Sequence, residues 1–111
     1  MINVALIGFG LAGKVFHATS ISRVENIKLK MVLTSRSNEV KDLYPEAQII
    51  SNIDEAISDS EIDLIVIATP NHLHHEQAKV SLLGGKNVVV DKPFAVTVTQ
   101  ASELVEIANQ K

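Results

Sequence analysis

The sequence predicts an α/β fold with a doubly wound parallel sheet, and two observations carry this prediction. Short apolar runs alternate with helical patterns along the whole chain of 111 residues, and repeated strand–helix–strand units form parallel sheets with right-handed crossovers. The stretch Gly8-Phe9-Gly10-Leu11-Ala12-Gly13 lies between the first apolar run and the first helical pattern, as glycine-rich turns do in Rossmann-type folds. We therefore expect three layers, α/β/α, and the strand order 3-2-1-4-5.

The first half of the chain is expected to contain three strands. Each is a short run of apolar residues bounded by polar or turn-forming residues. In order, the expected elements are a strand at Ile2–Ile7, a helix at about 12–22, a strand at Ile27–Leu33, a helical turn at Glu39–Leu43 and a strand at Ala47–Ile50. Pro45 stops the helical turn, because proline cannot continue a helix.

The second half continues the alternation. In order, the expected elements are a helix at Ile53–Ile57, a strand at Ile62–Thr69, a helix at His72–Leu83, a strand at Asn87–Val90 and a helix at about 97–109. Asn52 or Asp54 can cap the first of these helices, and Gly84-Gly85 occupy the C-cap position of the second. The strand at Ile62–Thr69 is nearly all apolar, as in a strand covered on both faces.

Composition is that of an ordinary soluble globular domain, with 46% hydrophobic and 21% charged residues. The net charge of -3 gives no basic surface, so we expect neither nucleic acid nor a membrane as a partner. The absence of cysteine excludes a disulfide framework, a thiolate nucleophile and a cysteine-based zinc site. No apolar run approaches the roughly 18 residues that a membrane span needs, and no signal peptide is evident. We expect a cytoplasmic protein.

The glycine turn predicts a binding site for a dinucleotide. Gly8 permits a tight turn, Gly10 lets the backbone approach a pyrophosphate, and Gly13 lets the helix pack closely on the strand. Free N–H groups and the positive end of the helix dipole favour anions at this place. Phe9, Leu11 and Ala12 complete the turn. The alternative is a glycine-rich turn that binds nothing.

The end of the second expected strand bears on which cofactor fits. NAD sites usually have an acid about 20 residues beyond the glycine motif, where it hydrogen-bonds the ribose 2′-hydroxyl. Here no carboxylate appears before Glu39. Ser35 and Arg36 instead offer a hydroxyl and a planar cation, which suit a 2′-phosphate. We therefore expect NADP in preference to NAD, and the alternative is that Arg36 is a solvated loop residue.

Three segments are expected to converge on one crevice, because the carboxyl ends of parallel strands share an edge. They are the glycine turn, Thr69-Pro70-Asn71 and Asp91-Lys92-Pro93. The Lys92 ammonium can hydrogen-bond a cofactor ribose and a substrate oxygen. It would stabilise the negative charge that develops on that oxygen as a hydride leaves. The alternative is an exposed lysine before a proline turn.

Together these segments resemble the N-terminal domain of the Gfo/Idh/MocA oxidoreductase family. The family pattern is a glycine fingerprint, a T-P-N-x-x-H-like segment and a G-K-x-V-x-x-E-K-P segment, and the resemblance covers essentially the whole chain. The stretches 14–18 and 33–36 further resemble a branch of NADP-dependent inositol, sugar and polyol dehydrogenases.

The resemblance implies roles for individual positions. The matching positions are Gly8, Gly10 and Gly13 for the pyrophosphate turn, Ser35 and Arg36 for the adenosine ribose, Thr69, Pro70 and Asn71 for the cofactor loop, His74 for the histidine of the next helix, and Asp91, Lys92 and Pro93 for the E-K-P motif. In the family the lysine of this motif lies near the nicotinamide ribose and the substrate hydroxyl, so Lys92 is the expected catalytic residue. Asp91 is one methylene shorter than the usual glutamate, which leaves its reach open.

His72, His74 and His75 could suggest a metal site. No cysteine is present, and Glu76 is the only nearby acid, so a polar helix start explains the cluster and we expect no metal.

The resemblance implies hydride transfer at a CH–OH group of a sugar or cyclitol. The family's second domain binds the substrate and usually supplies a catalytic histidine, and it does not fit within 111 residues. We therefore expect a truncated chain that holds the cofactor, is inactive alone, and is homo-oligomeric when full length. A non-catalytic NAD(P)-binding sensor or transcriptional co-regulator with the same fold stays open. A methyltransferase is a weaker alternative, because it leaves Lys92 unexplained.

Overall fold

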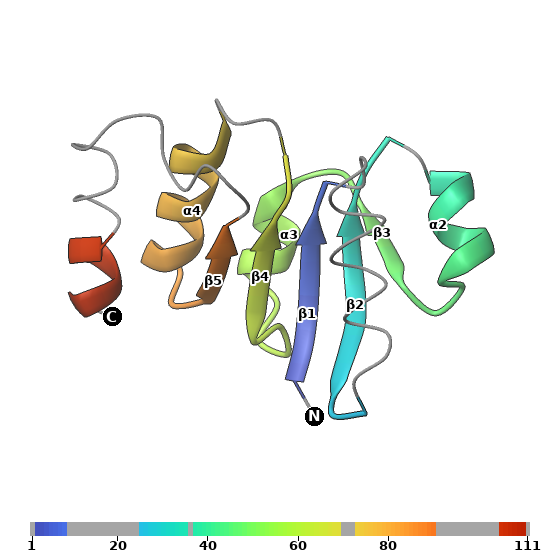
Figure 1. The fold of residues 1–111 in the computed structure, drawn as a ribbon, viewed down its shortest axis with the longest axis horizontal. Helices are drawn as coiled ribbons and strands as arrows, with labels where there is room; N and C mark the ends of the chain where they lie inside the picture. The colour runs from blue at the N-terminus through green and yellow to red at the C-terminus, as the bar shows by residue number, and fades with distance from the viewer. Residues whose placement is uncertain (1, 9–24, 36, 70–72, 91–104, 111) are drawn as a thin grey trace.

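The sheet has five parallel strands in the order β3-β2-β1-β4-β5, as Figure 1 shows. This confirms the predicted topology, with the crossover between β1 and β4. The computed structural model describes residues 2–8, 25–35, 37–69, 73–90 and 105–110. The expected helix at 12–22 and the beginning of the expected helix at 97–109 lie outside these ranges, whereas residues 105–110 are helical.

The described elements follow the expected order. They are β1 (Ile2–Ile7), β2 (Ile27–Leu33), α2 (Ser37–Leu43), β3 (Gln48–Ile50), α3 (Ile53–Ile57), β4 (Leu64–Ile67), α4 (His74–Leu83) and β5 (Asn87–Val90). The predicted bounds of β1, β2, α3 and β5 are confirmed. The helix α2 begins two residues before the predicted Glu39, and β3 begins one residue after the predicted Ala47.

The prediction of a strand over Ile62–Thr69 was too long at both ends. Residues 64–67 of β4 pair with β1 on one side and with all of β5 on the other. Ile62 is buried although it lies outside the strand, because it packs in the apolar cluster with Ile65 and Ile67 of β4. An apolar run indicates which residues are buried, but it does not indicate where the pairing of a strand with its neighbours ends. Ala68 and Thr69 are thereby left in the connection to α4.

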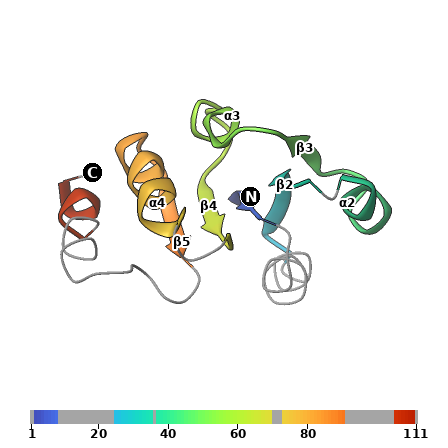
Figure 2. The same ribbon diagram turned by 90° about the horizontal axis from the view of Figure 1, so that it is seen from above.

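Two apolar clusters lie on opposite faces of the sheet, because successive strand residues point to opposite sides. Ala5 and Ile7 of β1 belong to the cluster under α3 and α4, which also contains Ala56 and Ala78 of those helices. Val4, Leu6 and other residues pack with Val40 of α2 in the second cluster. Figure 2 shows α3 and α4 on one side of the strands. Helices on both faces confirm the doubly wound arrangement.

A bulge at Lys30 interrupts the alternation in β2. Val4 is paired with Leu29 and Ala5 with Met31, so Lys30 is the extra residue. As a result Leu29 and Val32 face the α2 cluster, whereas Met31 faces the other. Residues 31, 32 and 33 can all be apolar because they alternate between two faces that are both covered.

The Lys30 ammonium hydrogen-bonds the Glu61 carboxylate, and its nitrogen lies 4.0 Å from an Asp59 carboxylate oxygen. The hydrogen bond to Glu61 and the attraction of Asp59 raise the pKa of Lys30. Because the folded pKa is the higher one, this stabilisation is complete through neutral pH. It is lost only as the pH rises through the raised pKa.

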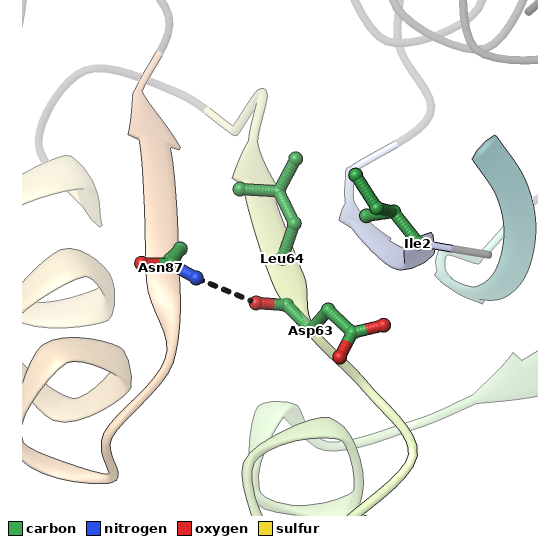
Figure 3. A pocket seen from close by; sticks show the side chains of 4 residues that line it. All are labelled: Ile2, Asp63, Leu64 and Asn87. Carbon is green, nitrogen blue, oxygen red and sulfur yellow. Dashed lines mark hydrogen bonds between the residues drawn. The ribbon is translucent and has the colours of Figure 1, made fainter. Parts of the chain in front are cut away.

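The loop before β4 is tied to the amino ends of two strands, β1 and β5. The Asn3 backbone N–H donates to an Asp63 carboxylate oxygen at 2.8 Å, and the Asn3 side chain donates to the Glu61 carbonyl at 2.9 Å. The Asn87 side chain donates to the Asp63 carbonyl at 3.3 Å, as drawn in Figure 3. A cavity of about 350 Å³ opens beside this bond, lined by Ile2, Asp63, Leu64 and Asn87. It lies at the edge opposite the predicted crevice.

Helix ends are capped as the sequence suggested. The Asn52 side chain accepts from the Asp54 N–H at 2.8 Å, and Glu55 accepts from the Asn52 N–H at 3.1 Å. This capping box shows that Asn52, not Asp54, is the N-cap of α3. Gly84 is the C-cap of α4, and a Cβ on Gly84 would stand 2.4 Å from the Ile57 Cγ2 methyl.

Lys86 joins the α4–β5 turn to the loop before β4. Its ammonium donates to the carbonyls of Asp59 and Ile62, each at 2.7 Å. We expect Lys86→Met to lower the free energy of unfolding by about 1–3 kcal/mol, because both carbonyls lose a charged donor. Chemical denaturation measures this, and Lys28→Met, at an exposed strand position, is the matched control. Equal stability of the two variants would contradict the bracing role of Lys86.

Gly8 and Gly85 are the described residues with positive φ, at 102° and 84°. A Cβ on Gly8 would stand 2.8 Å from the Ala68 carbonyl oxygen, whereas a Cβ on Gly85 would meet nothing within 4 Å. We expect Gly85→Ala to cost about 1–2 kcal/mol through backbone conformation alone. Gly8→Ala adds a backbone clash to the same strain, so its midpoint of thermal unfolding should fall clearly further. Equal midpoints would show that the β4 connection moves aside without cost.

Candidate functional site

The candidate site lies at the carboxyl edge of the sheet, where β1, β2 and β4 end side by side. Gly8 follows β1, Ser35 follows β2 after one residue, and Thr69 follows β4 after one residue. Parallel sheets bind ligands beyond this edge, next to the crossover between the two halves of the fold. The strand order places that crossover between β1 and β4. Two of the predicted segments, those around Gly8 and Thr69, therefore begin at the same edge.

Four predicted site residues are among the described residues, namely Gly8, Ser35, Thr69 and His74. The remaining predicted residues lie outside them and stay predictions: Phe9, Gly10, Leu11, Ala12, Gly13, Arg36, Pro70, Asn71, Asp91, Lys92 and Pro93.

Gly8 lies between the ends of β2 and β4. Its N–H donates to the Leu33 carbonyl at 2.9 Å, while the Ala68 N–H donates to the Ile7 carbonyl at 2.8 Å. The absent Cβ would stand 2.8 Å from the Ala68 carbonyl oxygen and 3.1 Å from the Thr69 methyl. Only glycine combines this positive φ with so little space. Glycine is therefore required at the residue where the predicted turn begins.

Thr69 is held by two side chains of α4. Its hydroxyl donates to the Gln77 side-chain oxygen, and its carbonyl oxygen lies 2.6 Å from His74 Nε2. A carbonyl can only accept, so His74 carries its proton on Nε2 in this contact. His74 is 1% exposed. This contact is with the backbone of Thr69, the first residue of the predicted cofactor loop, and a contact of His74 with a cofactor stays a prediction.

Sequence reasoning did not single out Gln77. The signal was present, because Gln77 lies three residues after His74 in the same helix and residues at that spacing share a face. A glutamine on a helix is ordinarily solvated, and nothing in the local pattern indicated a bond to a strand end eight residues earlier.

Ser35 is exposed directly beyond β2. The first carboxylate after β2 belongs to Glu39, which lies within the first turn of α2. In the sequence, residues 34–36 separate β2 from α2, and none of them is an acid.

Within the described ranges, no group of three or more His, Cys, Asp or Glu residues could hold a metal ion. No helix in this part of the chain is long and apolar enough to cross a membrane.

Comparison with known proteins gives a consistent assignment. Residues 2–111 match the model of the Gfo/Idh/MocA oxidoreductase family, described as having an NAD-binding Rossmann fold. The chain is 33% identical over 110 residues to the scyllo-inositol 2-dehydrogenase (NADP(+)) IolW of Bacillus subtilis, covering 99% of this chain and 31% of that protein. It is 45% identical over 107 residues to the uncharacterized oxidoreductase YdgJ of Escherichia coli, covering 96% of this chain and 31% of that protein.

Solved structures share the fold. The putative oxidoreductase YvaA of Bacillus subtilis superposes with a TM-score of 0.97 at 32% identity, covering 99% of this chain and 32% of that one. GenD2 from gentamicin A biosynthesis, solved with NAD, has a TM-score of 0.91 at 28% identity, covering 98% of this chain and 32% of that one. The chain spans about a third of the length of the relatives it matches. The resemblance read from the sequence is confirmed, and the chain belongs to the Gfo/Idh/MocA oxidoreductase family through its NAD(P)-binding Rossmann domain.

Proposed function

We propose that this domain binds NADP in preference to NAD and serves an oxidoreductase that transfers a hydride at a CH–OH group of a sugar or cyclitol. The observation that carries the proposal is the backbone at Gly8. Its positive φ and the lack of room for a Cβ require glycine where the predicted turn leaves the central strand. A pyrophosphate needs a close approach of backbone N–H groups, which a glycine turn that begins here would provide. The residues present therefore fit a dinucleotide.

The preference for NADP rests on the end of β2. A carboxylate there would accept the ribose 2′-hydroxyl and repel a 2′-phosphate. Glu39, the first acid, is placed within α2, and Ser35 is exposed ahead of it. We propose that Ser35 and Arg36 bind the 2′-phosphate, with the guanidinium donating to its oxygens. IolW, which is named for its use of NADP(+), supports this proposal at 33% identity.

The chemistry is proposed to centre on Lys92. The bound nicotinamide supplies a site that accepts or donates the hydride. Lys92 binds the substrate hydroxyl and stabilises the negative charge that develops on its oxygen as the C–H bond breaks. The hydroxyl proton would pass to the histidine that the family's second domain usually supplies. Asp91 holds the Lys92 ammonium in place. Pro70, Asn71 and Pro93 complete the walls of the crevice beside the cofactor.

Substrate recognition is proposed to lie outside this chain. The dehydrogenase relatives are about three times as long, and this chain covers 31% of IolW. Their names include scyllo-inositol 2-dehydrogenase and inositol 2-dehydrogenase, which supports a sugar or cyclitol as substrate class. We propose that the family's second domain provides the substrate pocket and the contacts of a homo-oligomer. The 111-residue chain should then bind the cofactor without turning over substrate.

Titration of the protein with NADPH and NADH tests the cofactor assignment. NADPH should bind at least about tenfold more tightly, because the 2′-phosphate gains charged hydrogen bonds that NADH cannot make. Arg36→Ala should weaken NADPH binding and leave NADH binding nearly unchanged. The exposed Lys41→Ala, in α2, controls for the loss of one positive charge. Tighter binding of NADH, with no effect of Arg36→Ala on either cofactor, would overturn the preference.

Lys92→Met in the catalytically competent full-length protein tests the proposed chemistry. The expected result is a loss of about 10²–10³-fold in kcat, because the developing charge on the substrate oxygen loses its cation. The dissociation constant of NADPH should change much less. Steady-state kinetics and fluorescence titration measure the two quantities separately. A variant with unchanged kcat would remove Lys92 from the reaction while leaving cofactor binding by the domain intact.

A further inference from the structure

Thr69 makes a different contact with each of its polar and apolar groups. The hydroxyl donates to Gln77 of α4, and the carbonyl oxygen is bound by His74 of the same helix. The Cγ2 methyl lies 3.1 Å from the point where a Cβ on Gly8 would stand. Thr69 therefore lies between α4 and the start of the glycine turn, with its hydroxyl toward the helix and its methyl toward the turn.

The χ1 rotamer of Thr69 decides whether its methyl or its hydroxyl faces Gly8. Threonine carries a methyl and a hydroxyl on the same carbon, and rotation about χ1 exchanges their places among staggered positions. His74 binds the main chain of Thr69 and does not distinguish these rotamers. The hydrogen bond to Gln77 does distinguish them, because it requires the hydroxyl on the α4 side.

Gln77 is well placed to hold this orientation. It is half-buried in α4, and the next residue, Ala78, belongs to the core cluster with Ile65 and Ile67 of β4. The helix is thereby fixed against the strand that leads to Thr69. A part-buried hydrogen bond between two anchored elements loses little entropy when it forms.

We propose that Gln77 is a positioning residue of the dinucleotide site and that it acts through Thr69. By accepting a hydrogen bond from the Thr69 hydroxyl, Gln77 keeps the Thr69 methyl against Gly8. It so fixes the backbone from which the pyrophosphate turn begins. Without this bond the Thr69 hydroxyl can rotate toward Gly8 and bring water into that contact. This inference rests on the proposed binding of the cofactor and concerns Gln77, which touches Thr69 and not the cofactor.

Gln77→Met in the full chain is the first test, read out as the dissociation constant of NADPH by fluorescence titration. Methionine keeps the length of the side chain and removes the acceptor. The affinity for NADPH should fall about 3- to 10-fold, the range expected for the loss of one neutral hydrogen bond. Gln48→Met makes the same chemical change at an exposed position at the start of β3 and should leave binding unchanged. A wild-type dissociation constant for Gln77→Met would overturn the proposal.

Thr69→Val distinguishes action through Thr69 from a general effect on α4. Valine carries methyl groups on both branches at nearly the same volume, so a methyl faces Gly8 in either rotamer. Adding Thr69→Val to Gln77→Met should therefore restore NADPH affinity to within about twofold of Thr69→Val alone, a non-additive result. If Gln77→Met causes the same fold loss in both backgrounds, Gln77 acts by another route and the proposal fails.

Thr69→Ser supplies a test that keeps the hydrogen bond to Gln77. It removes the methyl that lies against Gly8. We expect NADPH binding to weaken about 3- to 10-fold, as for Gln77→Met, because Gly8 loses the same support. The lost methyl should also lower the unfolding midpoint slightly. Wild-type affinity of Thr69→Ser would overturn the inference while the proposed function stands. Failure of the wild-type protein to bind either NADPH or NADH would overturn the proposed function, and the inference with it.

Discussion

The lack of space for a side chain at Gly8 is the constraint on which the candidate site depends. β1 is the central strand, with β2 on one side and β4 on the other. Where it ends, Gly8 bonds the Leu33 carbonyl of β2 and approaches the Ala68 carbonyl so closely that a Cβ would collide with it. The chain can leave the sheet at this point only as bare backbone. The same geometry that closes the sheet edge thus requires glycine at the residue from which the predicted pyrophosphate turn begins.

At the opposite edge of the sheet, lysine side chains hold the loop before β4 in place. Lys86 bonds two carbonyls of the loop before β4, and Lys30 pairs with acids of that loop. Lys86 and Lys92 flank β5, which spans Asn87–Val90. One lysine therefore braces the amino edge, and the other is predicted to follow the carboxyl end of the strand. The segment G-K-N-V-V-V-D-K-P thus contains two lysines with different proposed roles, because β5 places them at opposite edges of the sheet.

Much of the fold could be predicted because apolar periodicity reports burial directly. The strand order, the two helical layers and the capping role of Gly84 followed from pattern and turn chemistry. The ends of β4 did not, because Ile62 is buried outside the strand ladder. The bulge at Lys30 was also hidden, since both faces of β2 are covered and a run of apolar residues does not show which face each one enters. Gln77 escaped notice for a related reason: its bond to Thr69 joins a helix face to a strand end, and local patterns describe one element at a time.

The contacts of Thr69 also give a physical account of the spacing between threonine and histidine in the T-P-N-x-x-H segment. β4 ends at Ile67, Thr69 follows two residues later, and α4 begins at His74. Because helical side chains lean toward the N-terminus of their helix, the imidazole on the first turn points back toward the strand that precedes it. There it bonds the Thr69 carbonyl, which has left the strand ladder and needs a donor. A histidine one residue earlier or later in the helix would point about 100° away. The spacing therefore lets the first turn of α4 bond the residue that follows the end of β4, at the edge where the cofactor is proposed to bind.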